Sequence, residues 1–200
     1  VGHAQAVMQP WWNEASPPPA VRVVRATILQ YGHRFDDALA DLQAAAQAEP
    51  DEPEAFAWMA AIGMVRADYA AARQACERLD QLAEVLVGTA CTAYVDAMTG
   101  RAADASRRLR EALRSEKDTE PAQRLWALTR LAEIDERRGA RSEAEAAYRE
   151  ALALGRRDVY LQGAYADFLL DQRRPAEVLT LLTDGARADV LLLRLAIAAK

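Results

Sequence analysis

The stretch HRFDDALADLQAAAQAEP at residues 33–50 carries the pattern from which the architecture of the whole chain follows. After a polar turn and two acidic residues it places Ala38, then Leu42 four positions on, and then Ala45 three further on, before Pro50. Side chains three or four positions apart share one face of a helix. The stretch therefore predicts a short helix whose small residues let a second helix approach closely.

The same pattern recurs along the chain. Its first small residue falls at positions 38, 72, 105 and 144, and Val178 takes that place in the last copy, so the spacings are 34, 33, 39 and 34 residues. A second series of small residues precedes it, at Ala26, Ala60, Ala93, Ala132 and Ala166. A fixed period of this length indicates repeated helix pairs. The wide third spacing predicts a longer connection over 115–121, followed by a lengthened helix that ends near Arg138.

Composition favours an all-α chain. Of the 200 residues 45 are Ala, whereas Val, Ile and Thr together number 24. Ala is the best helix former, and sheets need β-branched and aromatic residues. A charged fraction of 28% and a mean hydropathy of −0.20 exclude a membrane bundle and a disordered acidic chain. No apolar run reaches the roughly 18 residues of a membrane helix, so we expect no membrane span.

The period and the small–large–small signature resemble the tetratricopeptide repeat (TPR) family. Ala38, Ala45 and Pro50 stand at that family's Ala, Ala and Pro positions. The resemblance implies an α-solenoid, a superhelix of antiparallel helix pairs with about five repeats and a terminal helix. The expected divisions are a preceding helix end with a Pro- and Trp-rich linker, then five repeats and the final helix, at residues 1–18, 19–52, 53–85, 86–118, 119–158, 159–186 and 187–200.

Three stretches, at residues 4–12, 160–171 and 187–194, resemble a group of proteobacterial TPR proteins with no assigned activity. Proteins of that group often carry an export leader. The resemblance therefore implies a periplasmic or exported protein in preference to a cytoplasmic one.

The sequence lacks the residue patterns of common enzyme sites. It holds two histidines, at a chain end and in a repeat turn, and no Gly-rich phosphate loop, HExxH or CxxC motif. We therefore expect no enzyme activity, no catalytic or metal residues and no cofactor. The net charge is −5, and the arginine clusters fall near helix ends or outer faces beside acidic residues, so nucleic acid is not an expected partner.

The two cysteines, Cys76 and Cys91, lie about equally far from a turn predicted near Glu84. An antiparallel helix pair would place them at similar height, where a disulfide forms if the side chains face each other. Such a bridge requires an oxidising compartment. The alternative is that each cysteine fills a small slot in the core as a free thiol.

The TPR register implies a groove along the first helix of each repeat. Its expected lining changes from apolar and aromatic to charged along the chain, which suits an extended peptide with an apolar and a charged part. The candidate groove residues are Thr27, Tyr31, Trp58, Met64, Tyr94, Met98, Trp126, Arg130, Glu133, Arg137, Asp167 and Asp171. The alternative is that Tyr31, Met64 and Met98 belong to the packed core.

Two hypotheses of function follow. The first is a non-enzymatic scaffold that binds a protein or peptide partner in the groove. The alternative is a structural or assembly segment of a larger exported bacterial protein, whose own flanking segments fill the groove. Self-association through the ends of the solenoid is a further expectation, because an end repeat leaves one face uncovered.

Overall fold

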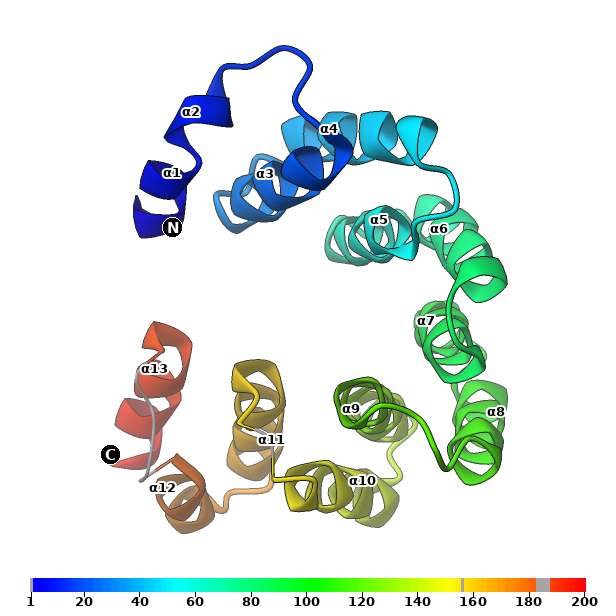
Figure 1. The fold of residues 1–200 in the computed structure, drawn as a ribbon. Helices are drawn as coiled ribbons and strands as arrows, with labels where there is room; N and C mark the ends of the chain where they lie inside the picture. The colour runs from blue at the N-terminus through cyan, green and yellow to red at the C-terminus, as the bar shows by residue number, and fades with distance from the viewer. Residues whose placement is uncertain (1, 156, 183–187) are drawn as a thin grey trace. The chain divides into compact units, whose positions relative to one another are not determined.

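The computed structural model describes residues 2–155, 157–182 and 188–200 (Figure 1). The chain is all-α within these ranges, which contain no strand. It forms two compact units, Val1–Thr99 and Gly100–Lys200. The predicted start of the final helix at residue 187 lies outside the described residues.

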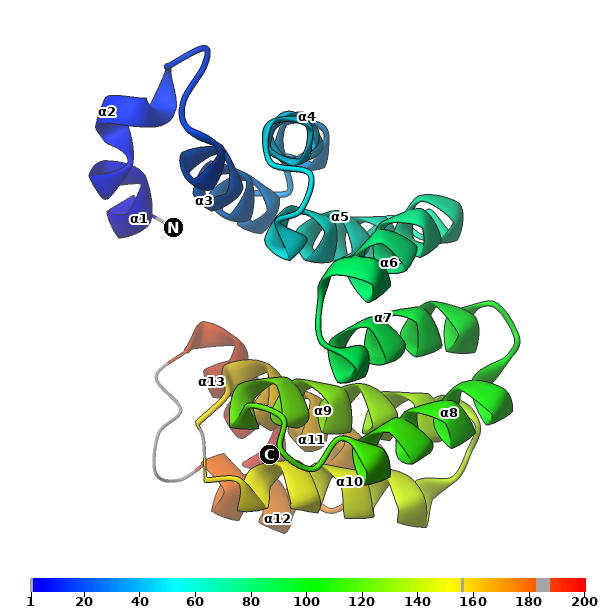
Figure 2. The same ribbon diagram turned by 45° about the vertical axis from the view of Figure 1, so that its right-hand side comes forward.

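The first unit holds seven described helices, drawn from blue to green in Figure 2. Within it α3 packs on α4 and α5 packs on α6, and α5 also contacts α4, α3 and α7. The helices are α1 (Gly2–Val7), α2 (Gln9–Trp12), α3 (Pro19–Tyr31), α4 (Phe35–Ala48), α5 (Pro53–Val65), α6 (Tyr69–Leu82) and α7 (Val85–Met98).

The second unit continues the pattern of antiparallel pairs, with α9 packed on α10 and α11 packed on α12 and α13. Its helices are α8 (Ala102–Ser115), α9 (Pro121–Arg137), α10 (Arg141–Ala153), α11 (Val159–Asp171), α12 (Pro175–Leu182) and α13 (Asp189–Ala198). At 17 residues α9 is longer than the 13 or 14 residues of its neighbours α8 and α10, which confirms the lengthened helix predicted from the wide spacing.

Local sequence explains where the helices begin and end. Several first helices open with proline, whose missing N–H costs nothing at a position that has no partner inside the helix. Between paired helices the chain turns through the left-handed region, at His33 (φ 57°) in the first pair and at Gly139 (φ 76°) in the fourth. His33 is thus a turn residue, as its place in the repeat indicated.

The two series of alanines lie in the core. Ala38, Ala72, Ala105 and Ala144 are completely buried, and so is Val178 in the last copy. The first-helix series is buried as well, at no more than 3% exposure for Ala26, Ala60, Ala93, Ala132 and Ala166. The abundance of Ala is therefore an architectural feature, because larger side chains at these positions would separate the paired helices.

The N-terminal segment differs from the linker predicted there. Residues 9–12 form the one-turn helix α2, since Pro10 falls in its first turn, where proline is tolerated. Trp12 packs against the core of the first unit, while Trp11 stays 39% exposed. Arg25 of α3 donates to the carbonyl oxygens of Trp11, Trp12 and Glu14 at 3.2, 3.3 and 3.0 Å. These bonds fasten the segment to α3.

None of the helices in the described part of the chain is both long enough and apolar enough to span a bilayer.

Candidate binding surface

The face that α9 and α11 present brings together predicted groove residues of the second unit. The two helices lie side by side, and α11 also contacts α13. Positions spaced by four, three and four residues share one side of α9. These positions hold Trp126, Arg130, Glu133 and Arg137, and α11 adds Asp167 and Asp171.

Arg130 sits at the centre of a cluster of two aromatic rings and one carboxylate. Its guanidinium carbon lies 4.5 Å from the ring centre of Tyr160 and 5.9 Å from that of Trp126, within cation–π range. Arg130 Nη1 is 2.9 Å from Glu133 Oε2, and the Tyr160 hydroxyl donates to Glu133 Oε1 at 2.6 Å. We call Trp126, Arg130, Glu133 and Tyr160 the platform, because these four side chains hold one another in place.

The platform is accessible at one ring and enclosed below it. Tyr160 is 51% exposed, whereas the Arg130 and Glu133 side chains are 12% and 16% exposed. Burial raises the pKa of the Glu133 carboxyl, against the lowering effect of Arg130 and of the bond from Tyr160. An ion pair and a hydrogen bond therefore fix the position of the Tyr160 ring, which faces solvent.

Carboxylates gather next to the platform. Glu136 accepts a hydrogen bond from the Tyr148 hydroxyl, and its pKa is raised first by burial and further by the negative charges of Glu133, Asp171 and Asp167. Arg194 of α13 donates from Nε to Asp167 Oδ1 at 2.7 Å. Within the described part of the chain, Asp171 has no cation at ion-pair distance. A partner's cation would be stabilised here.

In the first unit the predicted groove residues lie on α3, α5 and α7. Thr27 is half-buried, and its hydroxyl donates to the carbonyl oxygen of Val23 at 2.9 Å. Tyr31 is 67% exposed and so is not a core residue. Trp58 packs on the core and donates weakly to Glu54, at 3.5 Å. Half-buried side chains make up the rest of this set, namely Met64, Tyr94 and Met98.

The sequence interpretation missed two residues at the α9–α11 face, Glu136 and Arg194. Glu136 could have been identified from its spacing, because it stands three residues after Glu133 on the same helix and so lies near it on the helix surface. For Arg194 the signal is a single cation in the apolar run of α13, which indicates a carboxylate partner on a neighbouring helix, here the exposed Asp167 of α11.

The arginine clusters were expected near helix ends or outer faces, and Arg138 does lie at the end of α9, whereas Arg110 lies in the interior of α8. Both turn toward Asp135 of α9, which is completely buried. Arg138 Nε donates to Asp135 Oδ1 at 2.8 Å, and the Ser106 hydroxyl donates to the same oxygen at 2.6 Å. A buried carboxylate draws cations inward, since an unpaired charge there would be costly.

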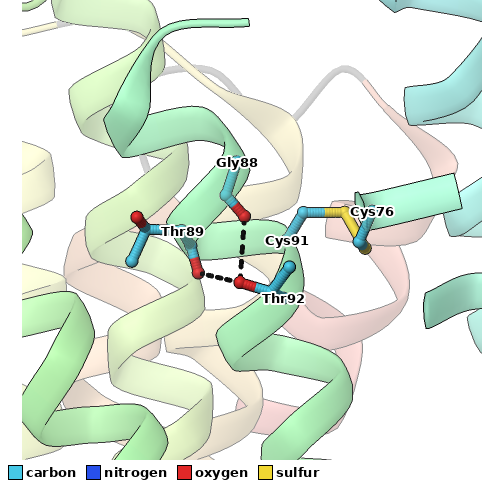
Figure 3. Close-up of a disulfide and its surroundings, with 5 residues drawn as sticks. All are labelled: Cys76, Gly88, Thr89, Cys91 and Thr92. Atoms are coloured by element: carbon cyan, nitrogen blue, oxygen red, sulfur yellow. Dashed lines mark hydrogen bonds between the residues drawn. A yellow bond between two sulfur atoms is a disulfide. The ribbon is translucent and has the colours of Figure 1, made fainter. Parts of the chain in front are cut away.

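The structure joins Cys76 of α6 to Cys91 of α7 by a disulfide, with Cα atoms 5.4 Å apart (Figure 3). Both residues are buried. The helices approach so closely beside the bridge that a Cβ at Gly88 would lie 2.5 Å from the Cα of Asp80. The neighbouring Thr92 hydroxyl donates to the Gly88 carbonyl oxygen at 3.1 Å. The described residues contain no group of three or more His, Cys, Asp or Glu that could hold a metal ion.

No family model and no curated protein matches the sequence. Several solved structures do match the fold. A thermophilic TPR protein of Thermus thermophilus is 21% identical, with a TM-score of 0.72 over 90% of this chain and 98% of its own. A TPR protein from Parabacteroides merdae is 15% identical, with a TM-score of 0.61 over 98% of this chain and 77% of its own. PilF of Pseudomonas aeruginosa is 12% identical, with a TM-score of 0.58 over 98% and 90%. Together with the buried alanine series, these likenesses show that the chain has the all-α fold of the tetratricopeptide repeat proteins.

Proposed function

We propose that this chain is a non-enzymatic scaffold that binds a segment of a partner protein on the face formed by α9 and α11. The observation that carries the proposal is the platform, in which the largely enclosed Arg130 lies against the exposed ring of Tyr160 and within cation–π range of Trp126. Trp, Tyr and Arg are the residue types enriched at binding hot spots. Because their positions are fixed before binding, little side-chain entropy is lost when a partner arrives.

The side chains of the α9–α11 face indicate which kind of partner segment would bind there. A large apolar or aromatic side chain fits against Tyr160, whose ring is half exposed. A Lys or Arg next to it in the segment fits Asp171 and Glu136. Burial raises the pKa of Glu136 first, and the carboxylates of Glu133, Asp171 and Asp167 raise it further, so a cation would relieve the repulsion among them. The proposed partner segment is therefore apolar and basic. The net charge of −5 also disfavours nucleic acid as the partner.

The test places a photoreactive benzoyl-phenylalanine at Tyr160 in the protein produced by its native cells. The matched control carries the same group at Ala146, an exposed position on α10. We expect a specific crosslinked partner from position 160 and not from position 146. Equal crosslinking from both positions contradicts the proposal.

Two charge reversals test the chemistry of the face. Asp171→Lys should abolish the crosslink at position 160, because it places a cation where the partner's cation binds. Glu77→Lys makes the same change at an exposed position on α6 and should leave the crosslink intact. If both variants lose the crosslink, the interaction depends on the overall charge of the protein, and the proposal that this face binds the partner is wrong.

The same experiment separates the scaffold from its alternative. If the chain is a structural segment whose face is covered by its own flanking sequence, the group at position 160 crosslinks within one chain and captures no other protein. The crosslinked peptides, identified by mass spectrometry, show which outcome holds.

A further inference from the structure

The first unit contains a cavity of about 440 Å³ between α4 and α6, with α5 at its base. Figure 1 shows α4 above α5 and α6 to the right of α5. A volume of this size lies within the range of ligand-binding pockets. The cavity contains none of the predicted groove residues, so it is a separate surface. Its lining is Leu39, Gln43, Phe56, Met59, Gly63, Arg66, Asp68, Ala71, Gln74, Ala75 and Arg78.

The lining runs along α5 at the base and along α6 on one wall, with Leu39 and Gln43 of α4 on the other wall. Positions 56, 59, 63 and 66 lie along one side of α5, a length of about 15 Å at the helical rise. The row on α6 holds positions 71, 74, 75 and 78. α5 and α6 are in close contact midway along these rows, since a Cβ at Gly63 would lie 2.9 Å from the Ala72 amide nitrogen, so the open space lies between these two helices and α4. The cavity is therefore an elongated slot that suits a peptide chain.

One end of the slot is apolar and positively charged. Phe56 and Met59 are half-buried and leave part of their side chains accessible. The Arg78 guanidinium carbon lies 5.4 Å from the ring centre of Phe56, and Arg78 donates to Gln81 and to the Pro50 carbonyl oxygen. No described carboxylate lies within ion-pair distance of Arg78. The charge at this end is thus not neutralised by the chain itself.

Among the residues that the structure describes, the other end of the slot has no unpaired cation. Arg66 bonds to Asp36 at 2.5 Å. The Asp68 carboxylate accepts from the Ala71 amide at 3.1 Å and so caps α6. A complementary anion is therefore favoured at Arg78.

We propose that the slot between α4 and α6 is a second binding site, which takes an acidic peptide segment of a partner protein. A large apolar side chain of the segment packs on Phe56 and Met59, and a neighbouring carboxylate pairs with Arg78. Gln43 and Gln74 on opposite walls offer amide groups to the peptide backbone. This site requires acidic ligand chemistry, the reverse of that proposed for the α9–α11 face.

Methionine methyl groups provide a site-specific readout. The chain has four methionines, of which Met59 lies in the slot and Met64 and Met98 belong to the predicted groove. The probe is the capped peptide acetyl-Ser-Asp-Phe-Asp-Ser-amide, titrated into the whole chain with ¹³C-labelled methionine methyls. We expect the Met59 resonance to move. The matched peptide with both Asp replaced by Asn should bind about tenfold more weakly, since it lacks the charge-assisted bond.

Matched variants locate the binding. Arg78→Gln should raise the Kd of the acidic peptide about tenfold, whereas Arg114→Gln, at an exposed position on α8, should not. Ala71→Trp fills the slot from an exposed position and should abolish binding, and Ala70→Trp beside it should not. Far-UV circular dichroism checks folding, and Ala71→Trp keeps the test decisive if Arg78→Gln does not fold.

The proposal is overturned if Met59 does not move, if Met64 or Met98 moves in its place, or if the Ala71→Trp variant binds as the parent chain does. Asp171→Lys should leave this titration unchanged. Its result separates the slot from the α9–α11 face, so either proposal can fail alone.

Discussion

Gly88 is required by the distance between α6 and α7. A Cβ there would lie 2.2 Å from Asp80 Oδ1 and 2.5 Å from Asp80 Cα, and a backbone atom cannot move aside as a flexible side chain can. Gly88→Ala should therefore lower the free energy of unfolding by about 1–3 kcal/mol through overpacking. Denaturant titration followed by circular dichroism measures the change.

Gly163→Ala is the control for Gly88→Ala. A Cβ at Gly163 would meet the Arg194 guanidinium carbon at 3.6 Å, an ordinary contact. Both substitutions lie inside helices and gain similar helix propensity. The difference between them isolates the close approach at Gly88, and equal effects would contradict the overpacking argument.

The Asp135 carboxylate, in the core of the second unit, accepts hydrogen bonds from three side chains. It is completely buried and accepts hydrogen bonds from Ser106, Arg110 and Arg138. Asp135→Asn should cost about 3 kcal/mol of unfolding free energy, because it removes the charge that two inward-turned cations require. The exposed Asp171→Asn should change stability by less than about 0.5 kcal/mol in the same denaturant assay.

Glu145 gives the second unit a defined sensitivity to acid. Two hydrogen bonds of 2.8 Å from Arg174, aided by Arg149, lower its pKa from 4.5 to about 2. The unfolded chain takes up this proton near pH 4.5 while the folded chain stays ionised. Stability that is complete above pH 4.5 is therefore lost as the pH falls toward 2.

Glu145→Gln should remove that dependence. We expect a loss of about 1 kcal/mol at pH 7, given that solvent screens the pair, and a shallower decline in stability between pH 4.5 and 2. Glu77→Gln, at an exposed position on α6, should keep the parent slope. Thermal melts across this pH range compare the three chains, and a parent-like decline in Glu145→Gln would refute the assignment.

The disulfide fastens α7 to α6 across the boundary between two predicted repeats. It closes a loop with a sequence separation of 15 residues, so its removal should cost about 3 kcal/mol through the greater freedom of the unfolded chain. The single variant Cys76→Ala and the double variant with Cys91→Ala should lose similar amounts of unfolding free energy, because either change abolishes the bridge.

Alkylation tests the bridge directly. Under non-reducing conditions it should modify no cysteine, and after reduction it should modify two. Two modified thiols without reduction would contradict the bridge.

The helix pairs could be predicted because crossing helices impose a residue type. Only a small side chain fits where two helices meet, so Ala38 and Ala72 recur with the period of the fold and are both completely buried. The helix α2 could not be predicted in this way. Pro10 indicates a break in most contexts, and its acceptance in a first turn depends on the bonds of Arg25 to the same segment.

The candidate sites were predictable along a helix and not between helices. Spacing places Trp126, Arg130 and Glu133 on one side of α9, because that relation is local. It does not show that the Tyr160 hydroxyl bonds to Glu133, nor that Asp135 is the partner of Arg110. The chain has 25 basic and 30 acidic residues, and side-chain packing between repeats selects which of them pair. The slot between α4 and α6 has no sequence signature, since it is lined from three helices.

The whole chain carries two proposed sites of opposite chemistry. The α9–α11 face favours a cation through Asp171 and Glu136, and the slot favours an anion through Arg78. A repeat fold can hold such sites separately, because each helix pair is stabilised chiefly by its neighbours. The same property determines how far along the chain a destabilising substitution affects neighbouring helices.

Hydrogen exchange measured by mass spectrometry should show local destabilisation. In repeat proteins the contacts are between neighbours, so a defect raises the opening rate most in the helices that touch it. Gly88→Ala should speed exchange in α5, α6 and α7 more than in α10, α11 and α12. Asp135→Asn should do the reverse, with its largest effect in α8, α9 and α10. If either variant accelerates exchange equally throughout the chain, the two units unfold as one and the nearest-neighbour account of this protein's stability is wrong.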